Sequence, residues 1–358
     1  MRVLQVIPGS YEIGKGGVAE HIRNISERLA ERHDVTVFAT DSEGLLPRHE
    51  LTKGVKVERF RRYAPNGAYF FSLEMILRMR KAEFDIVHGH CYAGFPVHFS
   101  RLAKYGKLVV TTHFHGAGHT AFRDALFRLF KPFGKRILEK ADNIVAVSEF
   151  EKSLLCKQFK FQEEKISVIP NGVNLSEFDG LKRHEREFKS ILYVGRLESY
   201  KGAQYLVEVL PRLDDTVVLE IVGKGPMRKS LENRAKQLGV LNRVRFSKDL
   251  PRRELLQKYF DNDVFALLST HEAYSIAVAE ALVAGTPCIV TDTSALSEWI
   301  DNQSCFGLGL PIRLRELANV IKTVFDDTPH RKAVKKWLGT KILDWDEVVR
   351  RLEEIYAG

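Results

Sequence analysis

Short apolar runs alternate with amphipathic segments along the first half of the chain. A run at residues 3–7 precedes residues 17–32, where Ile22, Ile25 and Leu29 recur with helical spacing. Further β-branched runs predict strands at residues 35–39, 86–88, 108–111 and 144–147. Strands and helices in this alternation predict a doubly wound parallel sheet, whose ligands bind beyond the carboxyl ends of the strands.

A second series of the same kind begins near Ser190. Its apolar runs predict strands at residues 191–194, 217–221, 244–246, 264–268 and 288–290. The polar stretch at residues 171–190 has no sustained period and marks the break between the two series. We therefore predict an α/β protein with two Rossmann-like, parallel-sheet domains that face a cleft, the first over residues 1–172 and the second over 173–343.

The composition of the chain limits the class of protein to which it can belong. The 358 residues are 44% apolar and 28% charged, which is ordinary for a globular protein of two domains. No run approaches the apolar length of a membrane span, and residues 1–10 read as a strand and loop rather than a signal peptide. We expect a cytoplasmic protein that can bind a membrane only from outside the bilayer. The four scattered cysteines lack zinc-ligand spacing.

The positive charge is concentrated in the first half. Residues 1–172 contain 27 Lys and Arg against 19 Asp and Glu, whereas the remainder is close to balance within the total of +9. A basic domain predicts an anionic partner, which includes phosphate groups, an acidic membrane surface or nucleic acid. No helix-turn-helix, RNA-recognition or finger pattern is present, so we expect no nucleic acid.

Two carboxylates, Glu272 and Glu280, stand in the stretch from Ser269 to Asp292. If a helix begins near Ser275, Glu272 lies in the loop before it and Glu280 lies inside it. The unpaired N–H groups at a helix N-terminus form an anion site, so an acidic group beside them suggests a ligand with both hydroxyls and phosphate. The alternative is that Glu272 caps the helix and Glu280 is solvated.

Three other features lie where strands end. Glycines including Gly16 and Gly17 precede the first helix, where backbone N–H groups can approach a phosphate. Arg196 and Lys201 follow a strand of the second domain and can bind a diphosphate. His113 ends a strand of the first domain, although an isolated histidine is more often structural. Nearby His115 and His119 lack a carboxylate with ligand spacing, so we expect no metal.

Together these residues resemble the family 4 retaining glycosyltransferases, the group 1 sugar transferases of GT-B architecture. The matching motifs follow one another along nearly the whole chain: Gly16-Gly17, Asp85-Ile86-Val87-His88, Thr112-His113, Val147-Ser148-Glu149, Pro170-Asn171-Gly172-Val173-Asn174, Gly195-Arg196-Leu197, Lys201-Gly202, Glu272 to Glu280 and Ala284-Gly285-Thr286-Pro287. The resemblance also places the last segment, residues 344–358, back on the first domain. It implies a hexosyltransferase-type enzyme that needs no cofactor beyond a UDP- or GDP-sugar co-substrate.

The resemblance assigns roles residue by residue. Glu280 would bind the donor ribose and Glu272 the hydroxyls of the transferred sugar. Arg196 and Lys201 would hold the diphosphate with the backbone at Gly16 and Gly17, and His113 would contact the sugar near the reacting carbon. The catalytic set is thus His113, Glu272, Arg196 and Lys201, and the donor-binding set adds Gly16, Gly17, Tyr274, Ser275, Ile276 and Glu280, with no metal ligand.

The sequence departs from the family at two places. The chain has Glu272-Ala273-Tyr274-Ser275 where the family often has Glu-Gly-Phe-Gly, which keeps the backbone donors but changes the surface against sugar and phosphate. A glycine common after the fourth strand of the second domain is replaced near residues 247–249, where the base is usually recognised. The identity of the base therefore stays open.

The acceptor side is expected on the basic first domain. Residues 119–140 and 63–81 mix aromatic with basic side chains, as interfacial segments do, although a core helix with a basic face has the same composition. We expect a glycan or lipid acceptor and peripheral binding to an anionic membrane surface at its inner face. The alternatives are a GT-B nucleotide-sugar epimerase or phosphorylase, and a non-enzymatic protein that binds anions or nucleic acid.

Overall fold

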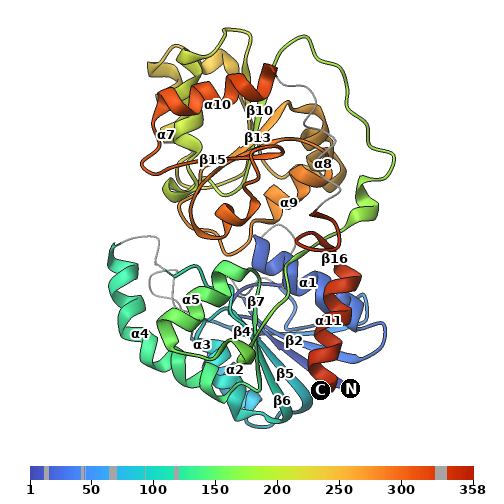
Figure 1. The fold of residues 1–358 in the computed structure, drawn as a ribbon. Coiled ribbons are helices and arrows are strands. Elements are labelled where there is room, and N and C mark those ends of the chain that lie inside the picture. The colour runs from blue at the N-terminus through green and yellow to red at the C-terminus, as the bar shows by residue number, and fades with distance from the viewer. Residues whose placement is uncertain are drawn as a thin grey trace. The chain divides into compact units, whose positions relative to one another are not determined.

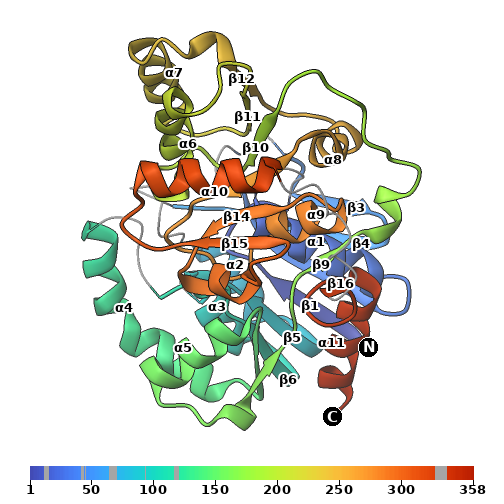
Figure 2. The same ribbon diagram turned by 45° about the horizontal axis from the view of Figure 1, so that its top comes forward.

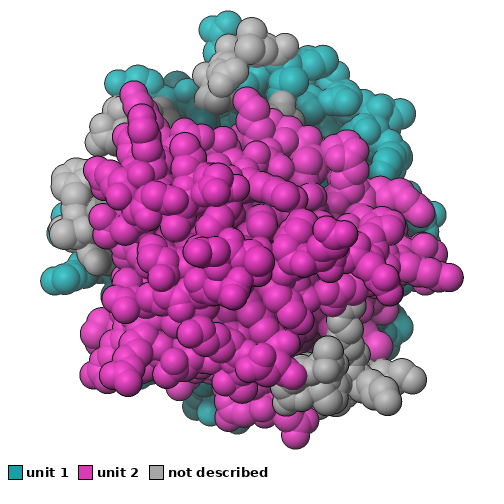
Figure 3. Space-filling view, turned by 90° about the horizontal axis from the view of Figure 1, so that it is seen from above, with its two compact units in different colours: residues 1–172, 345–358 teal, residues 173–344 magenta. Residues whose placement is uncertain are grey.

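The structure is a computed structural model of the chain (Figure 1). It describes residues 1–11, 16–41, 44, 46–63, 71–92, 94–116, 121–326 and 337–358, and for residues 121–127 the backbone alone. The chain forms two compact units, and Figure 3 colours them separately. Unit 1 contains residues 1–172 and 345–358, and unit 2 contains residues 173–344. Asp344, which we assigned to the first domain, thus falls in unit 2.

A sheet of eight described strands forms the centre of unit 1, in the order β3-β4-β2-β1-β5-β6-β7-β8. Every pairing is parallel except that of the edge strand β3 with β4. The strands are β1 (Arg2–Val6), β2 (Asp34–Asp41), β3 (His49–Thr52), β4 (Val55–Arg61), β5 (Glu83–His90), β6 (Lys104–Thr111), β7 (Asn143–Ala146) and β8 (Ile166–Val168).

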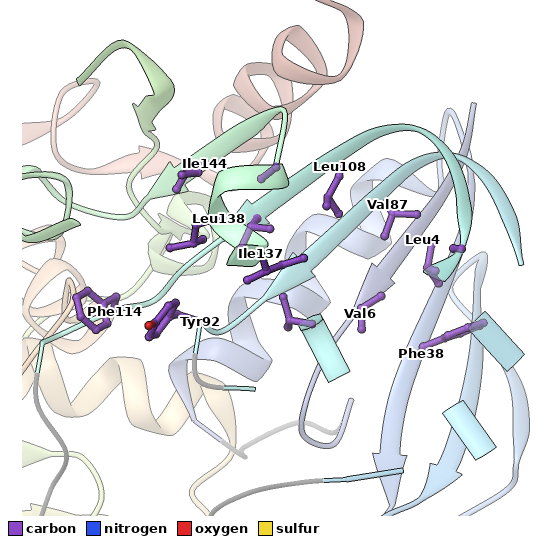
Figure 4. Packing of buried hydrophobic residues seen from close by; sticks show 14 of the residues in the cluster. Leu4, Val6, Phe38, Val87, Tyr92, Leu108, Phe114, Ile137, Leu138 and Ile144 are labelled. Carbon is purple, nitrogen blue, oxygen red and sulfur yellow. The ribbon is translucent and has the colours of Figure 1, made fainter. Parts of the chain in front are cut away.

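Helices cover both faces of this sheet because its strands are apolar on both faces. Leu4 and Val6 of β1 point into a core beneath α2 to α5, as the sticks in Figure 4 show for the sheet residues and for Ile137 and Leu138 of α4. Val3 and Gln5, which alternate with them, are also buried and therefore point to the opposite face. The helices are α1 (Gly17–Leu29), α2 (Leu73–Met79), α3 (Phe95–Phe99), α4 (Ala121–Lys140) and α5 (Glu149–Phe159).

The C-terminal helix α11 (Trp345–Ala357) belongs to unit 1 and contacts α1 (Figures 1 and 2). Its apolar residues recur at helical spacing and are buried: Trp345, Val348, Val349, Leu352 and Tyr356. Polar contacts add to this packing, since Lys107 Nζ donates to the Ile355 carbonyl at 2.9 Å and Arg28 Nε lies 2.6 Å from Asp346 Oδ1. The last helix thus completes the second face of the unit 1 sheet.

Unit 2 has a parallel sheet of six described strands in the order β12-β11-β10-β13-β14-β15. Its strands are β10 (Ser190–Val194), β11 (Val218–Val222), β12 (Val244–Ser247), β13 (Val264–Leu267), β14 (Cys288–Thr291) and β15 (Cys305–Leu308). Its helices are α6 (Ala203–Val209), α7 (Arg228–Gln237), α8 (Arg252–Asp261), α9 (Ile276–Val283) and α10 (Leu314–Asp326). Short strands β9 (Gly172–Val173) and β16 (Leu343–Asp344) pair where the chain passes between the units.

Both sheets are the parallel, doubly wound α/β type that the hydrophobic pattern predicts. The hydrophobic pattern did not predict four of the observed strands, β3, β4, β8 and β15. In each sheet the strand order reverses beside the first strand, between β1 and β5 in unit 1 and between β10 and β13 in unit 2. Loops that leave the carboxyl ends of such neighbouring strands diverge to opposite faces and leave room for a ligand.

Among the described residues, no helix has the length and apolarity that crossing a membrane requires.

Candidate active site

The reversal of strand order in unit 2 brings together two stretches that are far apart in sequence. The loop after β10 carries Arg196 and Lys201, and the loop after β13 carries Glu272. Because β10 and β13 are paired parallel neighbours, both loops leave the same edge of the sheet. Lys201 Nζ consequently lies 2.5 Å from Glu272 Oε1, and both side chains are largely buried. The two residues that we predicted to hold diphosphate and sugar are therefore direct partners.

The Lys201 loop is held by backbone geometry that only glycine can supply. Gly202 has φ of +79°, and a Cβ atom at this position would lie 2.2 Å from the Leu268 carbonyl oxygen. The loop after β10 can therefore approach the end of β13 closely. This contact fixes the short 3-10 turn Ser199–Lys201, and with it the base of the Lys201 side chain.

Arg196 is positioned by two tyrosines. The Tyr193 hydroxyl donates to the Arg196 carbonyl at 2.7 Å, and Arg196 Nη2 donates to the Tyr200 hydroxyl at 2.5 Å. Tyr200 also lies beneath the Lys201 ammonium, 5.4 Å from ring centroid to Nζ. The two cations predicted to bind the diphosphate thus share one aromatic neighbour, which sequence reasoning did not identify.

Helix α9 begins at the end of this loop with its N-terminal N–H groups directed away from the helix body. Ser275 is its N-cap, and the side-chain hydroxyl accepts from the Val278 N–H at 3.4 Å. Ser275 has φ of +83°, a conformation in which glycine is the least strained residue. Ile276 is the first helical residue. The predicted helix start at Ser275 is thus observed, and Ser275, rather than Glu272, caps the helix.

Tyr274 and Glu280 are more buried than their predicted roles suggest. The Tyr274 hydroxyl donates to the Lys341 carbonyl at 2.7 Å, and its ring packs on Trp299, so this side chain belongs to the core of unit 2. Glu280 lies 2.6 Å from Arg252 Nη1, whose Nε binds Glu177 at 2.7 Å. Burial by itself lowers the pKa of Arg252, but the two carboxylates outweigh this effect and the pKa is raised. Glu280 is therefore not a solvated helix residue.

Unit 1 provides the remaining predicted residues. Gly16 has φ of +111° and is the N-cap of α1, where it supplies no side-chain cap. Gly17 is the first helical residue, so its N–H is one of the donors that a helix leaves without an internal partner. His113 follows the end of β6, and its own φ is +45°. Gly16 and Gly17 lie beyond β1, next to β5 at the reversal of strand order.

The buried carboxylate of Glu151, which was not among the predicted site residues, accepts hydrogen bonds from residues on both sides of His113. Glu151 Oε1 accepts from the Thr112 hydroxyl and from the Phe114 N–H, and Glu151 Oε2 accepts from the Val147 N–H at 2.6 Å. The Glu151 side chain has no exposed surface. Its position on α5 after the N-cap Ser148 explains why a carboxylate reaches these donors. Glu151 is thus a positioning residue for the His113 turn.

Three further histidines surround His113 in unit 1. His21 lies edge-on to the His113 ring at a centroid distance of 4.9 Å, and His90 is stacked on it at 6.1 Å. His88 lies 4.2 Å from His90. Burial lowers the pKa of His21 to about 4 and that of His88 to about 3, and it lowers the pKa of His90 and His113 as well. All four imidazoles are therefore neutral at pH 7.

Two doubly wound parallel-sheet units in one chain are the architecture of the GT-B fold. Sucrose-phosphate synthase from Thermosynechococcus elongatus has the same fold, with a TM-score of 0.81 and 19% sequence identity over 99% of this chain and 98% of that one. The predicted fold class is therefore confirmed.

Two family models match in succession. The model for glycosyltransferase family 4 matches residues 15–177, and the model for glycosyl transferases group 1 matches residues 178–337. The chain thus belongs to the group 1 glycosyltransferases with a family 4 N-terminal domain, as its motifs predicted.

Curated relatives agree with this assignment. The chain is 27% identical over 372 residues to an uncharacterized glycosyltransferase of Methanocaldococcus jannaschii, covering 95% of this chain and 94% of that protein. It is also 27% identical over 392 residues to a glycogen synthase of Mycobacterium tuberculosis, covering 100% and 95%. The protein is an enzyme that transfers sugar from a nucleotide-sugar, and the alternative of a non-enzymatic binding protein is excluded.

Proposed function

We propose that the protein transfers a hexose from a UDP- or GDP-sugar with retention of configuration and without a metal ion. The observation that carries this proposal is the Lys201–Glu272 pair, since it joins a phosphate-binding cation to a hydroxyl-binding carboxylate at one strand edge. A nucleotide-sugar presents a diphosphate directly beside sugar hydroxyls. The pair therefore matches the two chemical groups that meet at the bond to be broken.

The chemistry follows from the charges that develop in the transition state. As the bond between the anomeric carbon and the phosphate oxygen breaks, negative charge grows on the diphosphate and positive charge on the sugar. Arg196, Lys201, the N-terminus of α9 and the N–H of Gly17 stabilise the first charge. The leaving diphosphate accepts the proton of the acceptor hydroxyl, whose oxygen attacks from the same face. In this scheme the protein supplies no nucleophile.

The carboxylates and His113 orient the donor in this scheme. Glu272 accepts hydrogen bonds from hydroxyls of the transferred sugar, and Glu280 accepts from the ribose hydroxyls while it remains paired with Arg252. His113 contacts the sugar near the reacting carbon. Tyr274, Ser275 and Ile276 contribute through their backbone, because the Tyr274 side chain is engaged in the core.

A donor panel with mass-spectrometric detection of released nucleotide tests the proposal. We expect one nucleotide-sugar to be turned over in EDTA, and Glu272→Ala to lower kcat/KM by about a hundredfold, which corresponds to nearly 3 kcal/mol of lost transition-state stabilisation. Glu316→Ala is the matched control, because Glu316 is an exposed glutamate of unit 2 that pairs with Arg313. Undiminished release by Glu272→Ala would remove the basis for its role.

The same panel separates transfer from epimerisation. A transferase releases free nucleoside diphosphate in proportion to glycosylated acceptor, whereas an epimerase yields a nucleotide-sugar of unchanged mass or a free epimeric sugar. Product mass and stereochemistry at the anomeric carbon are therefore both read from one reaction. An inverted product would contradict the retaining assignment.

We also propose that the acceptor is a glycan or lipid presented at an anionic membrane surface on the cytoplasmic side. The support is the outer face of α4, where Leu129 and Phe133 are 73% and 62% exposed beside the exposed Arg128 and Arg136. Phe130, one position along from Leu129, is buried, so the exposed residues form one face of the helix. Apolar and basic groups on one face suit the boundary between lipid headgroups and acyl chains.

Helix α2 also has exposed apolar residues. Leu73 and Leu77 are 59% and 52% exposed, and α2 contacts α3, which in turn contacts α4. Tyr63, beside the start of this segment, is also exposed. Of the two predicted interfacial segments, residues 64–70 and 119–120 lie outside the described residues, and residues 121–127 are described by their backbone alone.

Sedimentation with vesicles tests membrane binding. We expect the protein to sediment with vesicles that contain anionic lipid and to remain in the supernatant with neutral ones. The double variant Leu129→Ser with Phe133→Ser should lose this binding, whereas Leu241→Ser, at a 43% exposed leucine of unit 2, should keep it. Equal sedimentation with both vesicle types would contradict the proposal.

A further inference from the structure

Three histidines around His113 and including it bring ring nitrogens close together, and each has a buried ring nitrogen without a hydrogen-bond partner in the described structure. His21, His90 and His113 each offer one ring nitrogen, and these three atoms lie within 4.8 Å of one another. Within the described part of the chain, neither nitrogen of His21 has a partner of good geometry, and the same holds for His90 Nδ1 and His113 Nε2. His21 and His90 are buried, and His113 is half-buried.

The neighbouring hydrogen bonds fix the tautomer of His90. The Gln5 amide N–H donates to the Tyr356 hydroxyl at 3.3 Å, which leaves Gln5 Oε1 to accept from His90 Nε2 at 2.6 Å. With its proton on Nε2, His90 has a bare lone pair on Nδ1. This is the arrangement found behind metal-bound histidines, where the second ring N–H donates to a fixed acceptor.

His88 is adjacent to these residues but does not take part. The Tyr356 hydroxyl lies 2.7 Å from His88 Nδ1, and the Thr111 hydroxyl lies 2.7 Å from His88 Nε2. Both nitrogens of His88 are therefore occupied. The same chain of hydrogen bonds connects β5, β6 and α11 and holds the His90 ring in place.

We propose that His21, His90 and His113 form a binding site for one borderline transition-metal ion, Zn²⁺ in particular, with three imidazole ligands and an open fourth position. Zn²⁺ with nitrogen ligands at about 2.0–2.1 Å requires the nitrogens to be about 3.4 Å apart in tetrahedral geometry. Because the three nitrogens lie within 4.8 Å of one another, the rings must move closer together when the ion binds. Imidazole ligands favour Zn²⁺, Cu²⁺ and Ni²⁺ over Mg²⁺ and Ca²⁺.

A histidine binds a metal ion through the lone pair of its neutral ring. Binding to a metal would also satisfy nitrogens that are otherwise buried at a cost. If His113 contacts the donor sugar, as the proposed function requires, an ion at this site would exclude the sugar. Zn²⁺ would then inhibit an enzyme that EDTA leaves active.

Titration of the full chain with Co²⁺ tests the site without reference to activity. We expect one equivalent of Co²⁺ to give the intense visible absorption of a four-coordinate ion and to be displaced by Zn²⁺. His21→Phe should weaken this binding by more than about a hundredfold, since removing a second-shell partner alone costs tenfold to a hundredfold. Phenylalanine keeps the ring packing against Trp345.

His49→Ala is the control, since His49 is exposed on the edge strand β3. It should bind Co²⁺ as the wild type does, and Mg²⁺ should not compete. Equal Co²⁺ affinity in wild type and His21→Phe, or a spectrum of six-coordinate Co²⁺ only, would overturn the proposal. Metal binding without Zn²⁺ inhibition would keep the metal site but contradict the role of His113 at the sugar, which separates the two proposals.

Discussion

Replacing Glu151 by Gln should loosen the turn that carries His113 and slow transfer. The carboxylate accepts three hydrogen bonds, from Thr112, Phe114 and Val147, and none of its surface is exposed. Glutamine retains one acceptor oxygen, so its NH₂ group must face one of these donors. One buried donor left unpaired costs about 1–3 kcal/mol, and weakening two charge-assisted bonds to neutral ones costs about 1 kcal/mol each. We expect a local loss of about 3 kcal/mol.

Hydrogen exchange followed by mass spectrometry measures this loss where it occurs. About 3 kcal/mol corresponds to exchange roughly a hundredfold faster in the peptide that contains the Phe114 N–H, because local opening becomes that much more frequent. We expect kcat to fall at least tenfold with a small change in donor KM, since the residues proposed to hold the nucleotide lie mainly in unit 2. Glu149→Gln, two positions away and exposed, should alter neither. Unchanged exchange at Phe114 together with normal kcat in Glu151→Gln would refute the reasoning.

Three further predictions concern Lys201, Ser275 and the buried histidines. Lys201→Met should raise donor KM at least tenfold. It should also lower the melting temperature, because it leaves the largely buried Glu272 unpaired. The control variant Lys229→Met on α7 should change neither quantity. Ser275→Gly should stabilise the protein by about 0.5–1 kcal/mol in urea unfolding, because strain at φ of +83° exceeds the value of the lost cap and the added chain entropy; a loss of stability would contradict this. Because His21 and His88 have lowered pKa values, the unfolded chain binds more protons below about pH 6.5. Stability should be constant above that pH and fall by about 2 kcal/mol per histidine by pH 5, with a shallower slope in His21→Phe.

The alternation of strands and helices could be predicted from the chain because buried parallel strands leave continuous apolar runs. The missed strands have weaker patterns for identifiable reasons. Strand β3 is an exposed edge strand with Leu51 at the surface, and β8 is three residues long. Strand β4 does show the expected alternation at Val55 and Val57, so this strand was detectable. The periodic pattern of apolar residues arises from buried side chains. Short or exposed strands bury few side chains and therefore show only a weak pattern.

The candidate site was only partly accessible to sequence reasoning. Residues that follow strands, such as Arg196, Lys201 and His113, could be selected because ligands bind at strand ends. The buried state of Tyr274 could not be foreseen, since an aromatic residue in a loop contacts core or ligand with equal ease. Glu151 looked like an ordinary helix residue. Two of its three donors, the Thr112 hydroxyl and the Phe114 N–H, lie more than 30 positions away in the chain, where sequence reasoning could not connect them with it.

The sequence by itself determined the two parallel-sheet domains, the concentration of positive charge in the first, and the family to which the ordered motifs belong. Those properties depend on periodicity, composition and spacing, which are local. Only the tertiary structure decided that Lys201 meets Glu272 across 71 positions and that His21, His90 and His113 direct their nitrogens at one another. Strand order decides these contacts, because a parallel sheet places the ends of hydrogen-bonded neighbours together whatever their separation along the chain.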